Sequence, residues 1–157
     1  MHYLLSLLEF DVIGKIKMTS KGINIWSGCQ EMNGLGAALT NPTELSYVKR
    51  SVKNLYPVTF RGSVFADAEE AYQAFKSNHL KHDMQLMIEI LTAKLFQYPT
   101  LFNAIANNGG VAWLEKCQHI VTKNPRSRWE GVGRKSNFIL CLIGAFELVS
   151  KIKQIDS

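Results

Sequence analysis

The segment that most constrains the fold is the last helix expected along the chain, residues 136–152. Its sequence, SNFILCLIGAFELVSKI, is apolar on almost every face of a helix. A helix of this kind must be covered on several sides, so other segments have to pack around it. Ser136 is a natural N-cap for this helix. We therefore expect a domain built around a buried C-terminal helix.

Shorter helices are expected upstream of this segment. The pattern of apolar residues places them at residues 67–78, 83–96, 99–107 and 109–119. Pro99 stands where it can open a helix, because the first helical turn leaves its N–H groups unpaired in any case.

Strand signals are short. Ile23–Trp26 alternates in polarity, and residues 57–65 read as a hairpin that turns at Arg61-Gly62. Residues 28–45 are rich in glycine and small residues and are expected to be loop. The expected fold class is therefore α+β: a mainly helical single domain with a small antiparallel sheet or hairpin.

Length and composition fit one globular domain. The chain has 157 residues, 46% of them hydrophobic and 20% charged, which suffices for a single core. The apolar run at residues 4–8 is too short for a membrane helix and lacks a basic leader, so neither an anchor nor a signal peptide is expected. We expect residues 1–17 to be an N-terminal extension and residues 18–157 to form the domain.

The net charge and the cysteines limit which kinds of ligand, metal site and cellular compartment suit this chain. The net charge of +5 contains no long run of like charges, which suits a phosphate-bearing small molecule or weak attraction to nucleic acid. The cysteines, Cys29, Cys117 and Cys141, form no CxxC pair. Neither a zinc site nor a disulfide framework is expected, and a reducing, cytoplasmic location fits best.

Acidic residues cluster at the start of the helix expected at residues 67–78. Asp67 can cap it, and Glu70, three residues later, can close a capping box. Glu69 has no capping task, and it lies on or near one face with Gln73 and Lys76. This face is either ordinary solvated surface or a carboxylate at the mouth of a pocket, and the neighbouring segments favour the pocket.

Two further polar segments, residues 34–45 and 126–139, have a composition that is unusual for ordinary loops. Residues 34–45 end in Thr40 and Asn41, which could simply cap a turn. In residues 126–139, Trp129 precedes glycines and a helix start, where exposed N–H groups suit an anion. The glycine spacing is not that of a dinucleotide fingerprint.

Taken in order, these three segments resemble the NADAR superfamily of YbiA-like proteins, over about residues 34–146. The family's Glu-x-x-x-Gln-Ala-x-Lys helix is matched position for position by Glu69, Gln73, Ala74 and Lys76. Leu39-Thr40-Asn41 is similar to its Leu-Ser-Asn segment. Its Trp-Gly-x-Gly and Asn-x-Leu-Gly elements are similar to Trp129, Gly131 or Gly133, and Asn137.

The chain also departs from this pattern. The acidic residue that usually precedes the tryptophan is absent, and Glu130 follows Trp129 where glycine is usual. The chain thus resembles a divergent branch in which Glu130 could supply the lost carboxylate.

The resemblance implies an N-glycosidase that hydrolyses a ribosyl-phosphate or ADP-ribosyl compound, such as a riboflavin-pathway intermediate or ADP-ribosylated guanine. Glu69 would stabilise the oxocarbenium-like centre and activate water, and Glu130 is the second catalytic candidate. Gln73 would orient water or a ribose hydroxyl, and Trp129 would stack on a ring. The remaining candidate substrate contacts are Thr40, Asn41, Arg61, Lys76, Arg128, Gly133 and Asn137, the basic ones for phosphate.

Other interpretations remain open. A non-catalytic binder of NAD or ADP-ribose-type nucleotides would explain the lost acidic residue, whereas Glu69 argues against it. The basic charge mildly favours ADP-ribosylated nucleic acid over a free metabolite. Trp129 could be a core anchor, and His119 is more often a structural histidine than a base. His79, His82 and Asp83 lack further ligands at useful spacing, so no metal or cofactor is expected.

Overall fold

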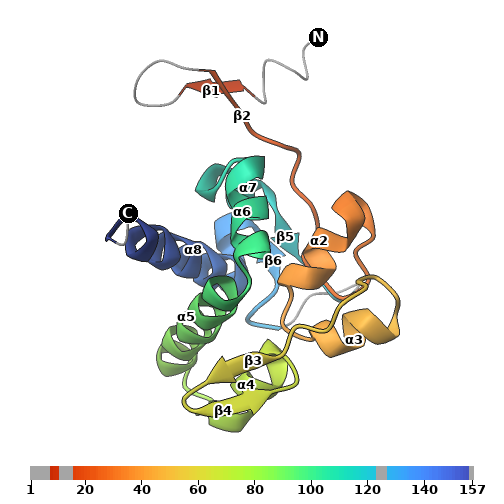
Figure 1. Cartoon of the computed structure of the whole chain (residues 1–157), viewed down its shortest axis with the longest axis vertical. Helices are drawn as coiled ribbons and strands as arrows, with labels where there is room; N and C mark the ends of the chain where they lie inside the picture. The colour runs from red at the N-terminus through yellow and green to blue at the C-terminus, as the bar shows by residue number, and fades with distance from the viewer. Residues whose placement is uncertain (1–7, 11–15, 123–126, 156–157) are drawn as a thin grey trace.

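Two long helices form the centre of the protein, whose computed structural model describes residues 8–10, 16–122 and 127–155 (Figure 1). Helix α8 (Asn137–Ile155) packs along α5 (Leu80–Gln97), and each buries a broad apolar face against the other. The expectation of a buried C-terminal helix is confirmed, because Ile139 and Leu142 on α8 are fully buried. Helix α5 begins nearly one turn earlier than the apolar pattern predicts.

Ser136 caps α8 and ties it to the preceding segment. Its Oγ accepts the backbone N–H of Ile139 at 3.1 Å and donates to the carbonyl oxygen of Trp129 at 2.7 Å. The predicted N-cap is therefore confirmed.

We expect Ser136→Ala to lower the free energy of unfolding by about 1 kcal/mol, the usual cost of losing an N-cap. Denaturant unfolding of both proteins measures this. An unchanged midpoint would contradict the capping role, and Ser150→Ala, late in α8, provides a serine control from the same helix.

Helix α6 (Pro99–Asn108) packs against α5, and α7 (Val111–Lys116) packs against α8 and α6. Pro99 opens α6 as predicted. The helix expected over 109–119 is shorter, because Gly109 and Gly110 adopt φ values of +131° and +66° and the chain is extended again from Cys117. Two short strands then pair antiparallel, β5 (Gln118–His119) with β6 (Gly131–Val132).

The predicted hairpin is confirmed. Strands β3 (Val58–Phe60) and β4 (Ser63–Phe65) pair antiparallel, and the turn residues Arg61 and Gly62 have φ values of +50° and +82°. Helix α4 (Ala68–Phe75) follows directly. It ends before residue 78 because Lys76 is already extended.

Residues 28–45 are only partly the loop that their composition predicts. They contain α2 (Glu31–Leu39), in which Met32, Asn33 and Gly34 depart from helical geometry with positive φ values, and they begin α3 (Thr43–Val48). Both helices lie on the side of the molecule opposite the C-terminal end of α8 (Figure 1). The small residues allow close packing rather than a turn. A Cβ atom added to Gly36 would lie 2.5 Å from the carbonyl oxygen of Asn24, so only glycine fits at this contact. The strand expected at Ile23–Trp26 is also wrong, because Asn24 forms only an isolated bridge to Gln118.

Near the N-terminus, β1 (Leu8–Phe10) pairs antiparallel with β2 (Ile16–Met18) at one end of the molecule (Figure 1). The rest of the extension expected over 1–17 lies outside the described residues. The α+β fold class, mainly helical with small antiparallel pairs, is confirmed. None of the helices in the described part of the chain combines the length and apolar character needed to cross a bilayer.

Candidate functional site

A pocket of about 650 Å³ opens where α4, the segment before β6, strand β5 and the start of α3 meet. Its size is within the range of small-molecule sites. Most of the residues predicted from the sequence line it, namely Thr40, Asn41, Glu69, Gln73, Lys76, Arg128, Trp129 and Glu130. Segments distant in sequence have therefore been brought together around one cavity.

Glu69 is held on the pocket wall by two side-chain amides. Its Oε1 accepts from Gln73 Nε2 at 2.8 Å, and its Oε2 accepts from Asn41 Nδ2 at 3.3 Å. The Gln73 contact follows from the spacing of four residues on α4. The backbone N–H of Glu69 also donates to the carbonyl oxygen of Asn41 at 3.3 Å. The half-buried carboxylate is thus fixed in direction at a helix N-terminus, which favours negative charge.

Asp67 and Glu70 make the capping bonds of α4, so Glu69 is not needed for capping. Asp67 accepts the N–H of Glu70 at 2.9 Å, and its second oxygen accepts the N–H of Glu44 on α3 at 3.0 Å. The Glu70 carboxylate returns to the N–H of Ala66, one residue before the cap. The predicted cap is confirmed, and it also fastens α4 to α3.

A buried lysine holds the backbone next to Asn41. Lys94, only 1% exposed, donates from Nζ to the carbonyl oxygen of Thr40 at 2.7 Å. Burial lowers the pKa of Lys94 to about 7, against the opposing charge of Asp67. Asn41, the next residue, is 5% exposed, and its Oδ1 has no hydrogen-bond partner among the described residues. An unpaired buried acceptor of this kind is costly and calls for a functional explanation.

Arg128 is positioned from two sides. Its guanidinium donates to Asp83 Oδ2 at 2.8 Å, and its carbonyl oxygen accepts from Asn137 Nδ2 at 2.7 Å. Asp83 is fully buried and also accepts the backbone N–H groups of Ser77 at 2.7 Å and Asn78 at 2.9 Å. Burial alone would raise the pKa of Asp83, but these donors and the guanidinium together lower it to about 2.

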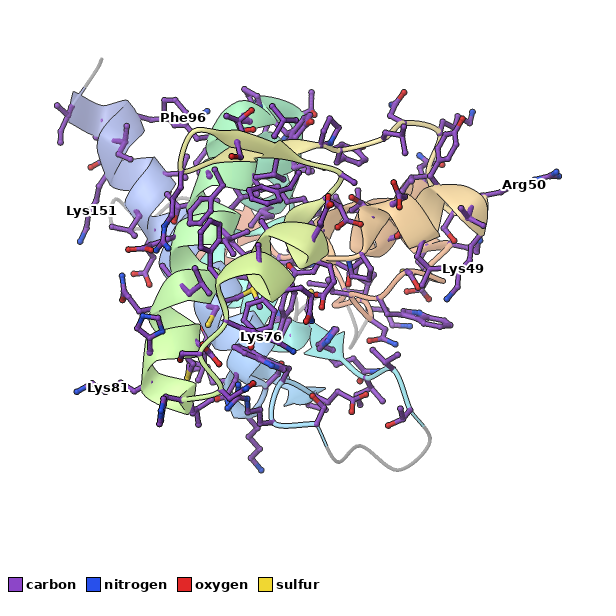
Figure 2. All side chains as sticks on the ribbon, turned by 90° about the horizontal axis from the view of Figure 1, so that it is seen from below. Lys49, Arg50, Lys76, Lys81, Phe96 and Lys151 are labelled. Atoms are coloured by element: carbon purple, nitrogen blue, oxygen red, sulfur yellow. The ribbon has the colours of Figure 1, made fainter. Side chains whose placement is uncertain are left out.

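Two lysines lie on the rim of the pocket. Lys76 is exposed at the end of α4 and forms no ion pair with any residue of the described ranges. Lys49, just after α3, donates to Ser27 Oγ at 2.7 Å and lies 5.0 Å from the ring centroid of Trp26. Figure 2 shows Lys76 beside α4 and Lys49 apart from it at the end of α3. The sequence carried no signal for Lys49, because α3 itself was not predicted.

Trp129 forms a wall of the pocket. Its ring meets Tyr72 edge to face, with the ring centroids 5.6 Å apart and an angle of 85° between the planes. The Arg128 guanidinium lies 5.5 Å from the same indole ring. Trp129 is half-buried, so one part of the ring is packed and another is available to a ligand.

Three predicted contact residues lie outside the pocket lining, so the structure does not bring them together with the others. Arg61 is exposed on the β3–β4 hairpin, where it pairs with Glu89 at 3.1 Å. Gly133 donates its N–H to Cys117, and a Cβ there would lie 2.5 Å from the carbonyl oxygen of Glu115, so this glycine serves packing. Asn137 acts through Arg128, as described above.

Glu130 lines the pocket but is engaged locally. Its carboxylate accepts the backbone N–H groups of Val121 and Thr122, the latter at 2.9 Å. Burial raises the pKa of Glu130, but these bonds outweigh it and the net shift is downward. Glu130 lies in the pocket lining as predicted, whereas its bonds indicate a role in joining the segment that follows β5 to the residue before β6.

No protein-family model, curated protein or solved structure significantly matches this chain. The resemblance to the NADAR superfamily therefore stays a prediction. No three His, Cys, Asp or Glu side chains gather as metal ligands within the residues that the structure describes. Nδ1 of His82 lies 3.7 Å from Oδ1 of Asp83. The three cysteines are buried and form no disulfide with one another.

Proposed function

We propose that this chain is an N-glycosidase that hydrolyses the bond between a ribosyl carbon and a nitrogen in a ribosyl-phosphate or ADP-ribosyl compound. The observation that carries the proposal is Glu69, a carboxylate fixed by Asn41 and Gln73 on the wall of a pocket of ligand size. The resemblance stated above supports the same activity. A cytoplasmic location, suited to free thiols, is part of the proposal.

The chemistry follows from the charge that this reaction develops. Breaking a ribosyl C1′–N bond leaves an oxocarbenium-like centre with positive charge on C1′ and the ring oxygen. A carboxylate that is already oriented stabilises this charge without reorganising as the bond breaks. Glu69 would supply that carboxylate, and Gln73 would hold the attacking water or a ribose hydroxyl beside it.

The basic rim supports an anionic substrate. Neither Lys76 nor Lys49 has an ion-pair partner among the described residues, and the side chain of Lys49 contacts the neutral side chains of Ser27 and Trp26. Both charges are thus available to phosphate oxygens. The Arg128 guanidinium is shared with Asp83 and would contribute less.

Trp129→Ala should weaken binding of ADP-ribose by about 1–3 kcal/mol, the usual value of stacking on a base. The measurement is titration calorimetry, with Trp129→Phe as the variant that retains an aromatic face. A loss of melting temperature with unchanged affinity would show instead that Trp129 is only a packing residue.

The test of the proposed function is release of free ribosyl product from a panel of substrates: phosphoribosyl-aminopyrimidines, ADP-ribose conjugates and ADP-ribosylated DNA. Turnover of one class would support the proposal and identify that class. Turnover of the DNA substrate alone would select modified nucleic acid as the partner. Tight binding of the panel without any turnover would favour the alternative, a non-catalytic binder of NAD or ADP-ribose-type nucleotides.

A further inference from the structure

The imidazole of His119 lies on the pocket wall with a defined proton arrangement. His119 is half-buried on β5, and its Nδ1 lies 2.6 Å from the carbonyl oxygen of Ile25. Because a carbonyl oxygen only accepts hydrogen bonds, Nδ1 carries the proton in the neutral ring. The other ring nitrogen, Nε2, is then an unprotonated base, and it has no hydrogen-bond partner among the described residues.

The ring is held in this orientation by packing. It lies against Phe138 on the first turn of α8, with ring centroids 4.7 Å apart and an angle of 35° between the planes. Its own backbone pairs with Gly131 in the β5–β6 ladder. A ring that is fixed by a hydrogen bond and an aromatic contact presents Nε2 in one direction, as a positioned base requires.

The surrounding charges set the protonation of the ring. Burial lowers the pKa of His119 below its usual 6.5, against the opposing fields of Glu130 and Glu69. Glu69 comes from α4 and Glu130 from the segment before β6. The other two segments packed on the ring, residues 23–26 and the first turn of α8, contain no ionisable side chain. The ring is therefore neutral at pH 7.

We propose that His119 is a catalytic base that accepts the proton of the water attacking the ribosyl carbon. The inference rests on the proposed function and adds a second group to Glu69. The water oxygen forms a bond to C1′, and the C1′–N bond breaks with its electron pair on the departing nitrogen. The water proton passes to Nε2 and is then given to that nitrogen, so the ring returns to its neutral form and no co-reactant is consumed.

The experiment compares wild type, His119→Asn and His82→Gln in the product-release assay, from the lowest pH at which the proteins stay folded up to pH 9. Asparagine can still donate to the carbonyl oxygen of Ile25, but it cannot take up a proton. We expect the wild-type kcat to fall as the pH drops below the pKa of His119. His119→Asn should lose about 10²–10³-fold in kcat together with that acid limb. His82→Gln should behave as wild type, because His82 is exposed outside the pocket lining.

The outcomes are separable. A wild-type enzyme whose kcat shows no acid limb anywhere in the pH range over which the protein stays folded would overturn the role of His119, and this holds whether or not the variant folds. So would a folded His119→Asn protein with wild-type kcat and pH profile. Absence of turnover by wild type on the whole panel would overturn the proposed function itself.

Discussion

Glu69→Gln should reduce kcat by about 10³-fold or more while leaving the fold intact. Glutamine has nearly the same shape, and its amide oxygen can still accept from Asn41 or Gln73, but it has no negative charge to stabilise an oxocarbenium-like centre. The measurement is single-turnover release of the ribosyl product at saturating substrate, which isolates the chemical step from binding.

The matched control is Glu89→Gln. Glu89 is an exposed glutamate on α5 that pairs with Arg61 and does not line the pocket. It should leave kcat unchanged and alter stability by only a few tenths of a kcal/mol. A Glu69→Gln protein as active as this control would remove the basis of the proposed mechanism.

Asp83→Asn should lower the free energy of unfolding by about 3 kcal/mol. The carboxylate of Asp83 is fully buried and gathers the N–H groups of Ser77 and Asn78 together with the Arg128 guanidinium. The amide would direct an NH₂ group at donors and leave the arginine without its counter-charge, which is costly at a buried site. Urea unfolding at pH 7 measures the difference.

The same substitution has a defined pH dependence. The pKa of Asp83 is lowered in the folded protein from 3.8 to about 2, so its ionisation stabilises the fold above pH 3.8. That contribution disappears as the pH falls through about 2. The difference in unfolding free energy between wild type and Asp83→Asn should therefore be constant near neutrality and shrink between about pH 4 and pH 2. The exposed Glu147→Gln variant on α8 serves as the control. A difference that does not depend on pH would show that Asp83 is not held ionised.

The features that sequence predicted well depend on contacts between near neighbours. The Asp67 cap, the Glu69–Gln73 pair and the hairpin turn each involve residues four or fewer positions apart, where propensity and spacing decide the geometry. The buried helix at the C-terminus followed from composition alone, because no other environment suits so many apolar side chains.

The features that the sequence did not predict depend on contacts between residues far apart in the chain. The contacts of Lys94 with Thr40 and of His119 with Ile25 span 54 and 94 residues of sequence, so local spacing gives no access to them. The position of Arg61 was not predictable for a related reason: a sequence shows that a cation lies near a site in the chain, but not that the hairpin directs it toward Glu89. In residues 28–45 the small residues that suggest a loop are also those that permit tight packing, and tertiary contacts decided between the two.

The segment carrying Arg128 and Trp129 is fastened to the start of α8 by three hydrogen bonds. The carbonyl oxygen of Trp129 accepts from Ser136 Oγ and from the backbone N–H of Phe138, and that of Arg128 accepts from Asn137. The conformational entropy of this wall is therefore lost when the central helix forms, before any ligand arrives. Ligand binding should then require little ordering of this segment, so almost none of the binding free energy that its contacts contribute would be offset by lost conformational entropy.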